Sequence, residues 1–364
     1  MPQYATEHYV PDIRIGIVGL HNHYHAYPFA KELKRGIPGL TLVGVADERP
    51  ELARQFGEEY GCDYTADYAE LINRDDVDAV IITSYTSAHA EHVELAAAAG
   101  KPILLDKPIS TTLADADRIV EAGKQVKIML AYLLRYLPAY RKVKDAVDAG
   151  AVGDLVSGFY SIRFPVGAIT DSPNTTEQGW YTDPIRGGGG GFLDHGVHFT
   201  DFFRWFFGSE PKSVVGTIGS LTYKNLGVED YGIATYTLEN GAIVTVESTW
   251  HAPDYFGPLS SPDHASLSGT KGEIELHYQK SPQYEIQGTE DPWKGRTYID
   301  LVGEERYDAC YRDLLVEFER AVRTDTEPVP NAVDGRVALE MILAAYESDR
   351  TGQRVSFPFT PKEA

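Results

Sequence analysis

The segment IRIGIVGLHNHYHAY, residues 13–27, decides the fold of this chain. Its opening run, Ile13–Val18, is almost continuously apolar, which is typical of a strand buried on both faces of a parallel sheet. Gly19 follows the run closely, and an amphipathic pattern over Tyr27–Gly36 predicts a helix beyond it. A buried strand that leads into a helix is the first half of a strand–helix–strand unit.

The same unit repeats through the first 130 residues. Further apolar runs predict buried strands at Thr41–Ala46, Ala79–Ile82, Pro102–Leu105 and Lys127–Leu130. Helical patterns between them lie at Pro50–Tyr60, Ser87–Ala99 and Thr112–Gly123. This alternation predicts an α/β Rossmann fold with a doubly wound parallel sheet.

The pattern changes beyond a predicted helix at Pro138–Asp148. Strand character recurs at Leu155–Phe164, Ser213–Thr222, Tyr231–Leu238, Ala242–Ser248 and Gly272–His277, and helical patterns at Asp194–Phe207, Tyr307–Arg323 and Asp334–Thr351. We expect a second, α+β domain with a large, mostly antiparallel open sheet. The expected boundaries are residues 1–130 and 131–364, with the C-terminal helix packed back on the first domain. Helices on one face leave the other exposed, so we expect a homodimer or homotetramer through that sheet.

Composition limits the partners. The chain has 364 residues and a formal net charge of −21, with 54 acidic and 33 basic side chains. Such an excess opposes binding to phosphate backbones and anionic membranes, so we expect neither nucleic acid nor a membrane as a partner. The 2 cysteines lie far apart, no signal-peptide pattern opens the chain, and no apolar run approaches the roughly 18 residues of a membrane span. We therefore expect a cytoplasmic protein.

The segment GGGGGFLDHGVH, residues 187–198, carries the strongest functional signal. Asp194 and His198 are four apart, so on a helix they share one face. A carboxylate and an imidazole beside a flexible glycine entry suit proton transfer to and from a substrate hydroxyl. The alternative is structural: an aspartate near a helix N-terminus and a hydrogen-bonded core histidine.

The ends of the predicted parallel strands are where a doubly wound sheet binds its ligand. A dinucleotide loop has the pattern Gly-x-Gly-x-x-Gly/Ala, which Gly19 begins, but His21 and Tyr24 stand at the second and third positions and obstruct close approach of a pyrophosphate. Asp47 ends the second strand, where an acid binds the ribose hydroxyls of NAD, while Arg49 keeps NADP possible.

Two later strand ends are also polar. The loop TSYTSAH follows Ile82, and Asp106-Lys107-Pro108 follows Leu105. A lysine held at that position can reach the cleft between the domains and hydrogen-bond a substrate hydroxyl or carbonyl group.

These motifs together resemble the glucose-fructose oxidoreductase / inositol dehydrogenase / rhizopine catabolism (Gfo/Idh/MocA) family. The likeness runs essentially end to end. Its parts are IGIVGL, VGVAD, TSYTSAH at the family's T-P-N-x-x-H position, DKP at its Glu-Lys-Pro position, RYLPAY, AGAVGD, GGGGGFLDHGVHFTDFFRWFFG and DGRVALEMILAAYESDRTGQRV. The chain departs from the family at Asp106, which is usually glutamate, at Tyr85, and at His21 and Tyr24.

The resemblance implies an NAD(P)-dependent oxidoreductase that acts on a hydroxyl-bearing carbon of a sugar, cyclitol or related polyol. It implies that His198 is the general acid/base, that Lys107 polarises and orients the reacting oxygen, and that Asp194 holds the substrate or tunes the histidine. NAD is the expected cofactor and NADP a possible one. The residues expected to bind it are Gly16, Gly19, His21, Asn22, Asp47, Thr83, Ser84, His89, Asp106 and Lys107. Those expected to face the substrate are Arg135, Tyr160, Arg163, Trp180 and His195.

Two other functions stay open at this point. The chain is also compatible with a catalytically silent nucleotide- or sugar-sensing protein of the same fold. His21 and His23 at a strand end also resemble the first ligands of a metal-dependent hydrolase, since neutral imidazoles suit zinc. The later strand ends carry no further ligands in that pattern, so no metal is expected.

Overall fold

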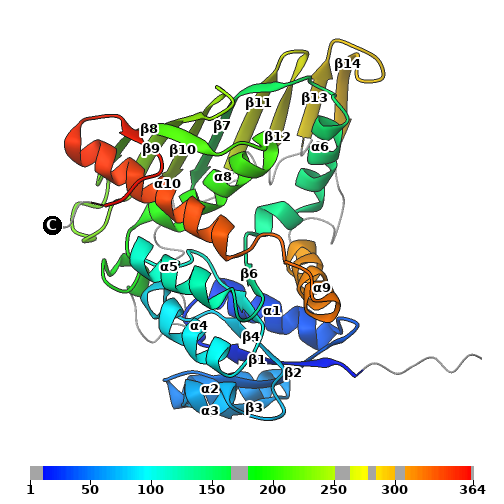
Figure 1. Ribbon diagram of the computed structural model, residues 1–364, viewed down its shortest axis with the longest axis vertical. Coiled ribbons are helices and arrows are strands. Elements are labelled where there is room, and N and C mark those ends of the chain that lie inside the picture. Colours follow the sequence, from blue (N-terminus) through cyan, green and yellow to red (C-terminus); the bar gives the residue numbers. More distant parts are fainter. Residues whose placement is uncertain (1–10, 165–178, 251–262, 278–283, 300–307, 362–364) are drawn as a thin grey trace, which may run out of the picture.

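Two β-sheets organise the protein (Figure 1). The computed structural model describes residues 11–164, 179–250, 263–277, 284–299 and 308–361. The six-stranded sheet lies low in Figure 1 and the nine-stranded sheet lies at the top, with α10 between them. This arrangement confirms the predicted fold class, a Rossmann-type sheet combined with a large, mostly antiparallel sheet.

The first sheet is parallel throughout, with strand order β3-β2-β1-β4-β5-β6. The order reverses between β1 and β4, so the loops that follow these two strands meet at the switch point where such sheets bind ligands. The strands are β1 (Ile13–Val18), β2 (Leu40–Ala46), β3 (Asp63–Thr65), β4 (Ala79–Ile82), β5 (Ile103–Leu105) and β6 (Ile128–Leu130). The helices are α1 (His23–Arg35), α2 (Pro50–Tyr60), α3 (Tyr68–Ile72), α4 (His89–Ala98) and α5 (Leu113–Ala122), with a 3-10 turn η1 (Thr86–Ala88).

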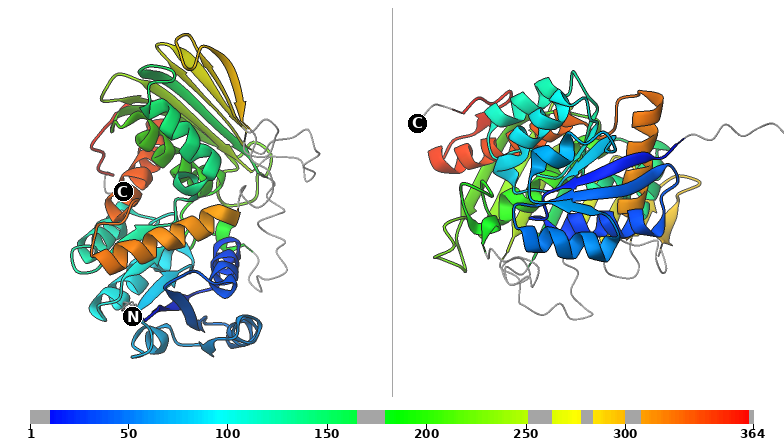
Figure 2. Two further views of the ribbon diagram at one scale, coloured as in Figure 1. Left: turned by 90° about the vertical axis from the view of Figure 1, so that its right-hand side faces the viewer. Right: turned by 90° about the horizontal axis from the view of Figure 1, so that it is seen from below.

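The second sheet has strand order β14-β13-β12-β11-β7-β10-β9-β8-β15. Its pairs are antiparallel except β7 and β10, which run parallel. The strands are β7 (Leu155–Arg163), β8 (Pro211–Gly219), β9 (Tyr231–Leu238), β10 (Ile243–Thr249), β11 (Asp263–Gly269), β12 (Gly272–His277), β13 (Tyr284–Gly288), β14 (Gly295–Ile299) and β15 (Val355–Ser356). The helices α6 (Pro138–Asp148), α8 (Gly191–Phe207) and α10 (Ala332–Thr351) lie on one side of it (Figures 1 and 2).

Several predicted elements differ from the structure. Helix α1 begins at His23 rather than Tyr27, so the histidine-rich segment that looked like loop forms the first turn of the helix. Helix α8 begins at Gly191 rather than Asp194, so Asp194 lies within its first turn and His198 lies one turn further along. The sequence analysis did not predict β3, α3, β11, β13 or β14.

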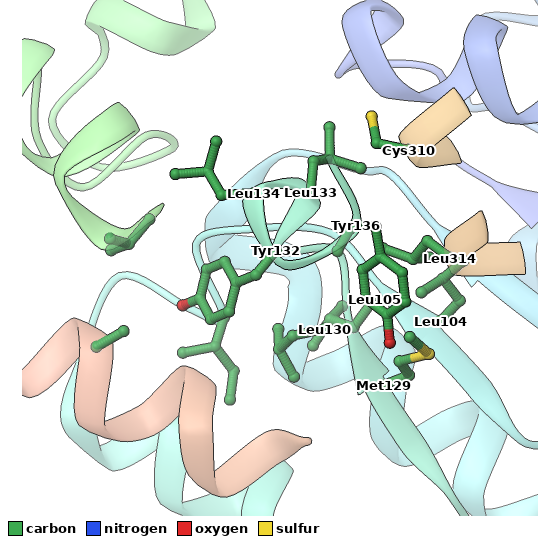
Figure 3. Packing of buried hydrophobic residues seen from close by; sticks show 14 of the residues in the cluster. Leu104, Leu105, Met129, Leu130, Tyr132, Leu133, Leu134, Tyr136, Cys310 and Leu314 are labelled. Atoms are coloured by element: carbon green, nitrogen blue, oxygen red, sulfur yellow. The ribbon is translucent and has the colours of Figure 1, made fainter. Parts of the chain in front are cut away.

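The junction between the two sheets is apolar. Figure 3 shows side chains from β5 and β6 packed together with those of η2 (Leu133–Tyr136) and with Cys310 and Leu314 of α9 (Asp308–Thr324). Helix α10 contacts α5 and β6 on one side and α8 and β8 on the other. The two sheets therefore share one hydrophobic core. The polar loops that follow β1, β4 and β5 lie beside this core. The division at residues 130 and 131 stays a prediction.

Within the described residues, no helix has both the length and the apolar character needed to cross a membrane.

Candidate active site

Lys107 and Asp194 meet in a buried ion pair. The Lys107 ammonium lies 2.7 Å from the Asp194 carboxylate and donates a further bond of 2.9 Å to the Asp194 carbonyl oxygen. Lys107 stands just beyond β5 at the ligand-binding edge of the first sheet, and Asp194 lies in the first turn of α8. Both residues are less than 9% exposed. The structure thus joins two of the three predicted catalytic residues across the two halves of the chain.

His198 follows Asp194 by one helical turn, as the spacing predicted, and is also buried. Its ring meets Tyr132 edge-on, with centroids 5.7 Å apart, and its Nδ1 has no hydrogen-bond partner. A buried imidazole nitrogen without a partner carries a desolvation cost that a bound ligand can remove. This feature speaks against a merely structural histidine, because those are normally hydrogen-bonded.

The electrostatics of the pair decide the protonation of His198. Burial, the Lys107 ammonium and the neighbouring histidines hold the pKa of His198 well below its ordinary value, against the smaller opposing effect of Asp194. Burial alone would raise the pKa of Asp194, but His195 and Lys107 outweigh it and hold that pKa well below its ordinary value. At neutral pH the His198 imidazole is therefore neutral and the Asp194 side chain is ionised. Burial affects the pKa of His198 more strongly than the neighbouring carboxylate does.

The glycine run before α8 is tightly packed, which corrects the expectation of a flexible entry. A Cβ on Gly190 would lie 1.9 Å from the Glu229 carbonyl oxygen, and one on Gly188, whose φ is +85°, would lie 2.6 Å from Thr111. These positions require glycine because other parts of the backbone and core come too close for any side chain.

Glu229 caps α8 from the loop before β9, and the sequence analysis did not identify it. One carboxylate oxygen accepts hydrogen bonds from the amides of Gly190, Phe192 and Leu193, at 2.8, 3.1 and 3.3 Å, and from the Tyr346 hydroxyl at 2.7 Å. The first amides of a helix lack intrahelical partners and attract negative charge. Glu229 therefore holds the start of the helix that carries Asp194 and His198. No local pattern marks this residue, since it lies 35 positions after Asp194.

Asp106 ties the nucleotide loop to the lysine. Its carboxylate accepts a 2.6 Å bond from the Asn22 amide, lies 2.5 Å from His25 Nδ1 and accepts the Lys107 backbone N–H at 2.7 Å. Burial raises the pKa of Asp106, but His25 and Lys107 outweigh this effect and leave the pKa below its ordinary value. Asp106, which stands where the family usually has glutamate, thus contacts both the nucleotide loop and Lys107. Asn22 does not cap α1 because its side chain is used here.

The predicted ribose site has the expected acid. Asp47 is fully buried at the end of β2, and its carboxylate accepts the Leu20 N–H at 2.7 Å. Arg49 donates two bonds to the same carboxylate, at 2.7 and 2.8 Å. Because Arg49 is held by Asp47, its charge is largely neutralised where an NADP phosphate would need it.

His21 and Tyr24, which replace residues of the glycine pattern, differ in how deeply their side chains are buried. Tyr24 is 38% exposed, whereas His21 is fully buried and meets Tyr85 edge-on with centroids 4.8 Å apart. Neither ring nitrogen of His21 has a hydrogen-bond partner. Burial and the Arg49 charge lower the pKa of His21 to about 3, so the ring is neutral and offers one donor and one acceptor.

The loop therefore fits a dinucleotide. Gly19 has a φ of +83°, and a Cβ there would lie 2.7 Å from Ser84 Cα, so the turn needs glycine. The turn leads to the start of α1, where a phosphate is favoured by the helix dipole. Asp47 stands beside this turn at the end of β2, and the His21 ring nitrogens lie 3.9 Å from the Asp47 carboxylate and 3.4 Å from the Glu48 carboxylate.

Three of the remaining predicted cofactor residues make hydrogen bonds near the ends of β1 and β4. Thr83 donates a 2.5 Å bond to the Gly19 carbonyl oxygen, and Ser84 lies 2.9 Å from His92 Nδ1. His89 is buried between the Ser84 and Pro108 carbonyl oxygens, at 3.1 and 2.9 Å. Gly16 lies within β1 against Leu71 and Val77, away from the loop.

Trp180 and Tyr181 close over this edge from η3 (Trp180–Thr182). Trp180 donates a 3.1 Å bond to the His21 carbonyl oxygen, and Tyr181 donates a 2.7 Å bond to the Asn22 side chain. A small pocket beside them is lined by Thr86, Lys107, Pro108, Trp180, Tyr181, Gly187, Gly189 and Asp194.

Of the other predicted substrate residues, only His195 joins this group. Its Nδ1 lies 3.0 Å from the Asp194 carboxylate. The Arg135 guanidinium is bound by both oxygens of Asp201, at 2.7 and 2.8 Å. The Tyr160 hydroxyl bonds to Tyr140 at 2.7 Å within the core. The Arg163 side chain is 62% exposed, 3.5 Å from Glu247. The structure does not bring these three to Lys107.

The histidines proposed for a metal hydrolase do not converge. His21 faces Tyr85, His23 packs on Tyr24 with centroids 4.0 Å apart, and His25 contacts Asp106. His21 precedes α1, whereas His23 and His25 lie in its first turn, where successive side chains point in different directions. Nothing in the described part of the chain supports that alternative.

A doubly wound sheet, a large open sheet and a buried lysine–aspartate pair between them define a two-part dinucleotide-dependent oxidoreductase. Residues 13–132 match the oxidoreductase family with an NAD-binding Rossmann fold, and residues 140–275 match the GFO/IDH/MocA C-terminal domain. The chain belongs to the Gfo/Idh/MocA family, as its motifs indicated. It is an oxidoreductase, and its first part is an NAD-binding Rossmann domain.

Relatives match along nearly the whole chain. Inositol 2-dehydrogenase 3 of Saccharopolyspora erythraea is 30% identical over 94% of this chain and 95% of its own length. The scyllo-inositol 2-dehydrogenase (NAD(+)) of Bacillus subtilis is 27% identical over 94% of this chain and 96% of its own. The structure of levoglucosan dehydrogenase in complex with NADH and levoglucosan has a TM-score of 0.82 at 22% identity, covering 96% of this chain and all of that one, which is a likeness of fold.

Proposed function

We propose that this protein transfers hydride between NAD and a hydroxyl-bearing carbon of a cyclitol, sugar or related polyol. The observation that carries the proposal is the Lys107–Asp194 pair at 2.7 Å, with neutral His198 one turn away and a dinucleotide-compatible loop beside it. The inositol dehydrogenases among the relatives support a polyhydroxylated substrate.

Each residue has a defined task in this proposal. His198 is neutral, so it takes the proton from the substrate hydroxyl during oxidation and returns it during reduction. Lys107 donates a hydrogen bond to the reacting oxygen and stabilises negative charge on it. Asp194 holds the Lys107 ammonium in place, and Glu229 holds the helix that carries Asp194. The bound nicotinamide supplies the hydride acceptor or donor.

NAD is the proposed cofactor because of Asp47. A 2′-phosphate would place negative charge next to the buried Asp47 carboxylate, and the nearby Arg49 guanidinium already donates two hydrogen bonds to that carboxylate. Trp180, Tyr181 and His195 are the proposed substrate contacts, since they surround the pair.

Assembly is proposed through the face of the second sheet that lies opposite α8 and α10. Side chains on that face alternate with buried ones along each strand, and exposed apolar residues occur there, namely Val215, Ile243 and Tyr298. A dimer or tetramer that covers this face would bury them.

The test combines binding and turnover. Purified protein is titrated with NADH and NADPH by fluorescence and then assayed with a panel of inositols, aldoses and alditols. We expect tighter binding of NADH, and reduction of NAD⁺ by at least one polyol. His198→Asn serves as the control, with NADH binding kept and turnover lost. Protein that binds NADH but oxidises no polyol, and reduces no corresponding ketone or aldose, would contradict the proposal.

A further inference from the structure

A histidine pair stands on the face of the second sheet that is opposite α8. Along β11 and β12, Ala265, Leu267, Ile274 and Leu276 are buried toward the helices. The alternate residues point the other way, because successive side chains of a strand lie on opposite faces. They include His264 on β11 and both Glu275 and His277 on β12.

The three side chains are neighbours in space. His264 and His277 are directly paired in the antiparallel register, and their rings stack with centroids 4.8 Å apart and planes 14° apart. Glu275 is two residues before His277, and its carboxylate lies 2.5 Å from His264 Nε2. One donor atom of each residue lies within 4.8 Å of the other two. Among the described residues this is the one such group of histidine, cysteine and carboxylate side chains.

We propose that His264, Glu275 and His277 form a binding site for one divalent transition-metal ion, with zinc as the best match. Two imidazoles and one carboxylate are a ligand set that zinc accepts, and they leave a fourth position for water. Magnesium and calcium prefer six or more oxygen ligands, so this set disfavours them.

The geometry needs only side-chain movement. Zinc bonds of about 2.0–2.2 Å in a tetrahedron place donor atoms roughly 3.4 Å apart. The present donor separations reach 4.8 Å, so closure requires rotations about the side-chain bonds and shifts of about 1 Å. The backbones are already held by the β11–β12 pairing, which extends from His264 to Gly269. Such a bound ion would clamp these two strands together.

The site is separate from the proposed catalytic residues. Helix α8, which carries Asp194 and His198, packs on the opposite face of the sheet against β7, β9 and β10. A substitution at His264 or His277 therefore leaves the Lys107–Asp194 pair untouched. This inference does not depend on the proposed function, and its failure would leave that proposal unchanged.

The test measures zinc directly. Full-length protein is stripped with a chelator, desalted and titrated with ZnCl₂ by calorimetry, and bound metal is counted after gel filtration. We expect one zinc ion per chain at micromolar affinity or better, and a rise in Tm because zinc binds the folded state. His264→Ala and His277→Ala are each expected to weaken binding at least tenfold, and Glu275→Gln to weaken it less.

Glu273→Gln is the matched control, since Glu273 lies on the same face of β12, two residues before Glu275. Its zinc affinity is expected to match that of the wild type, and oxidoreductase activity is expected to persist in all four variants. The site is refuted if the wild type retains no zinc, or if the His264→Ala and His277→Ala variants still bind one ion per chain at wild-type affinity. The latter result would place the ion elsewhere in the protein.

Discussion

The Lys107 ammonium and the Asp194 carboxylate lie 2.7 Å apart although 87 positions separate them in the chain. Lys107 follows β5 of the Rossmann sheet, and Asp194 lies in α8, which packs on the open sheet. The pair therefore has two consequences that can be measured separately, one for folding and one for turnover.

Lys107→Met is expected to lower the free energy of unfolding by about 3–5 kcal/mol, because it leaves the buried Asp194 carboxylate without its partner. It is also expected to lower kcat by about 10²-fold or more. Adding Asp194→Asn removes the stranded charge, so the double variant should regain much of the stability and none of the turnover. Urea denaturation and steady-state kinetics on the four proteins of this cycle measure both effects. Recovery of turnover in the double variant would show that Lys107 acts only through the ion pair.

His198→Asn is expected to retain the fold and NADH affinity while losing about 10²–10⁴-fold in kcat. The pH profile gives a second readout. Because the pKa of His198 is held well below 6.5, the neutral base persists as the pH falls through 6.5. The acid limb of kcat/KM for oxidation should therefore lie below pH 6.5. An acid limb centred at 6.5 or above, or near-wild-type turnover of His198→Asn, would argue against this assignment.

Glu229→Ala is expected to destabilise the protein by about 2–3 kcal/mol, because three amides at the start of α8 lose their acceptor. Glu229→Gln keeps an acceptor oxygen and should cost less. Tyr346→Phe removes one hydrogen bond to the same carboxylate and serves as the matched control, with a loss of about 1 kcal/mol. If Glu229 positions the catalytic helix, kcat should fall in the order Tyr346→Phe, Glu229→Gln, Glu229→Ala. Equal kcat in all three would limit Glu229 to a role in stability.

Stability should fall steeply in mild acid. Burial lowers the pKa of His21 to about 3 and the pKa values of His23 and His92 to about 4. The unfolded chain takes up these protons near pH 6.5, whereas the folded protein does not until the pH is much lower. The stability that these buried, neutral histidines contribute is fully present above pH 6.5 and is lost as the pH falls toward 4. Urea titrations at pH 7.5, 6.5, 5.5 and 4.5 measure the decline, which should be shallower in His92→Gln. A stability that stays constant from pH 7.5 to 4.5 would contradict this reading.

The regular parts of the fold were predictable because their signals are local. The bounds of α2, β4, β9 and α6 agree with the sequence patterns residue for residue. Strands β11, β13 and β14 were missed because they are rich in polar residues and glycine, and their few apolar residues become informative only once the sheet aligns them. The start of α1 was placed at Tyr27, since His21 to His25 carry no apolar periodicity.

The candidate site was predictable in part for a related reason. The spacing of Asp194 and His198 is a helical signal, and Lys107 stands directly after a predicted buried strand, where the family resemblance also implies a catalytic lysine. Glu229 acts through contacts between distant segments, which no local pattern contains. Arg135 and Tyr160 appeared to be available donors, but Asp201 and Tyr140 already bind them. Because these partners occupy both side chains, the structure does not favour substrate binding by Arg135 or Tyr160.

The crowded glycines before α8 also bear on engineering. A methyl group on Gly190 would lie 1.9 Å from the Glu229 carbonyl oxygen, so saturation libraries at this position should yield mostly misfolded protein. Variation aimed at a new substrate range is better placed at Thr86, Trp180 and Tyr181, whose side chains line the same pocket.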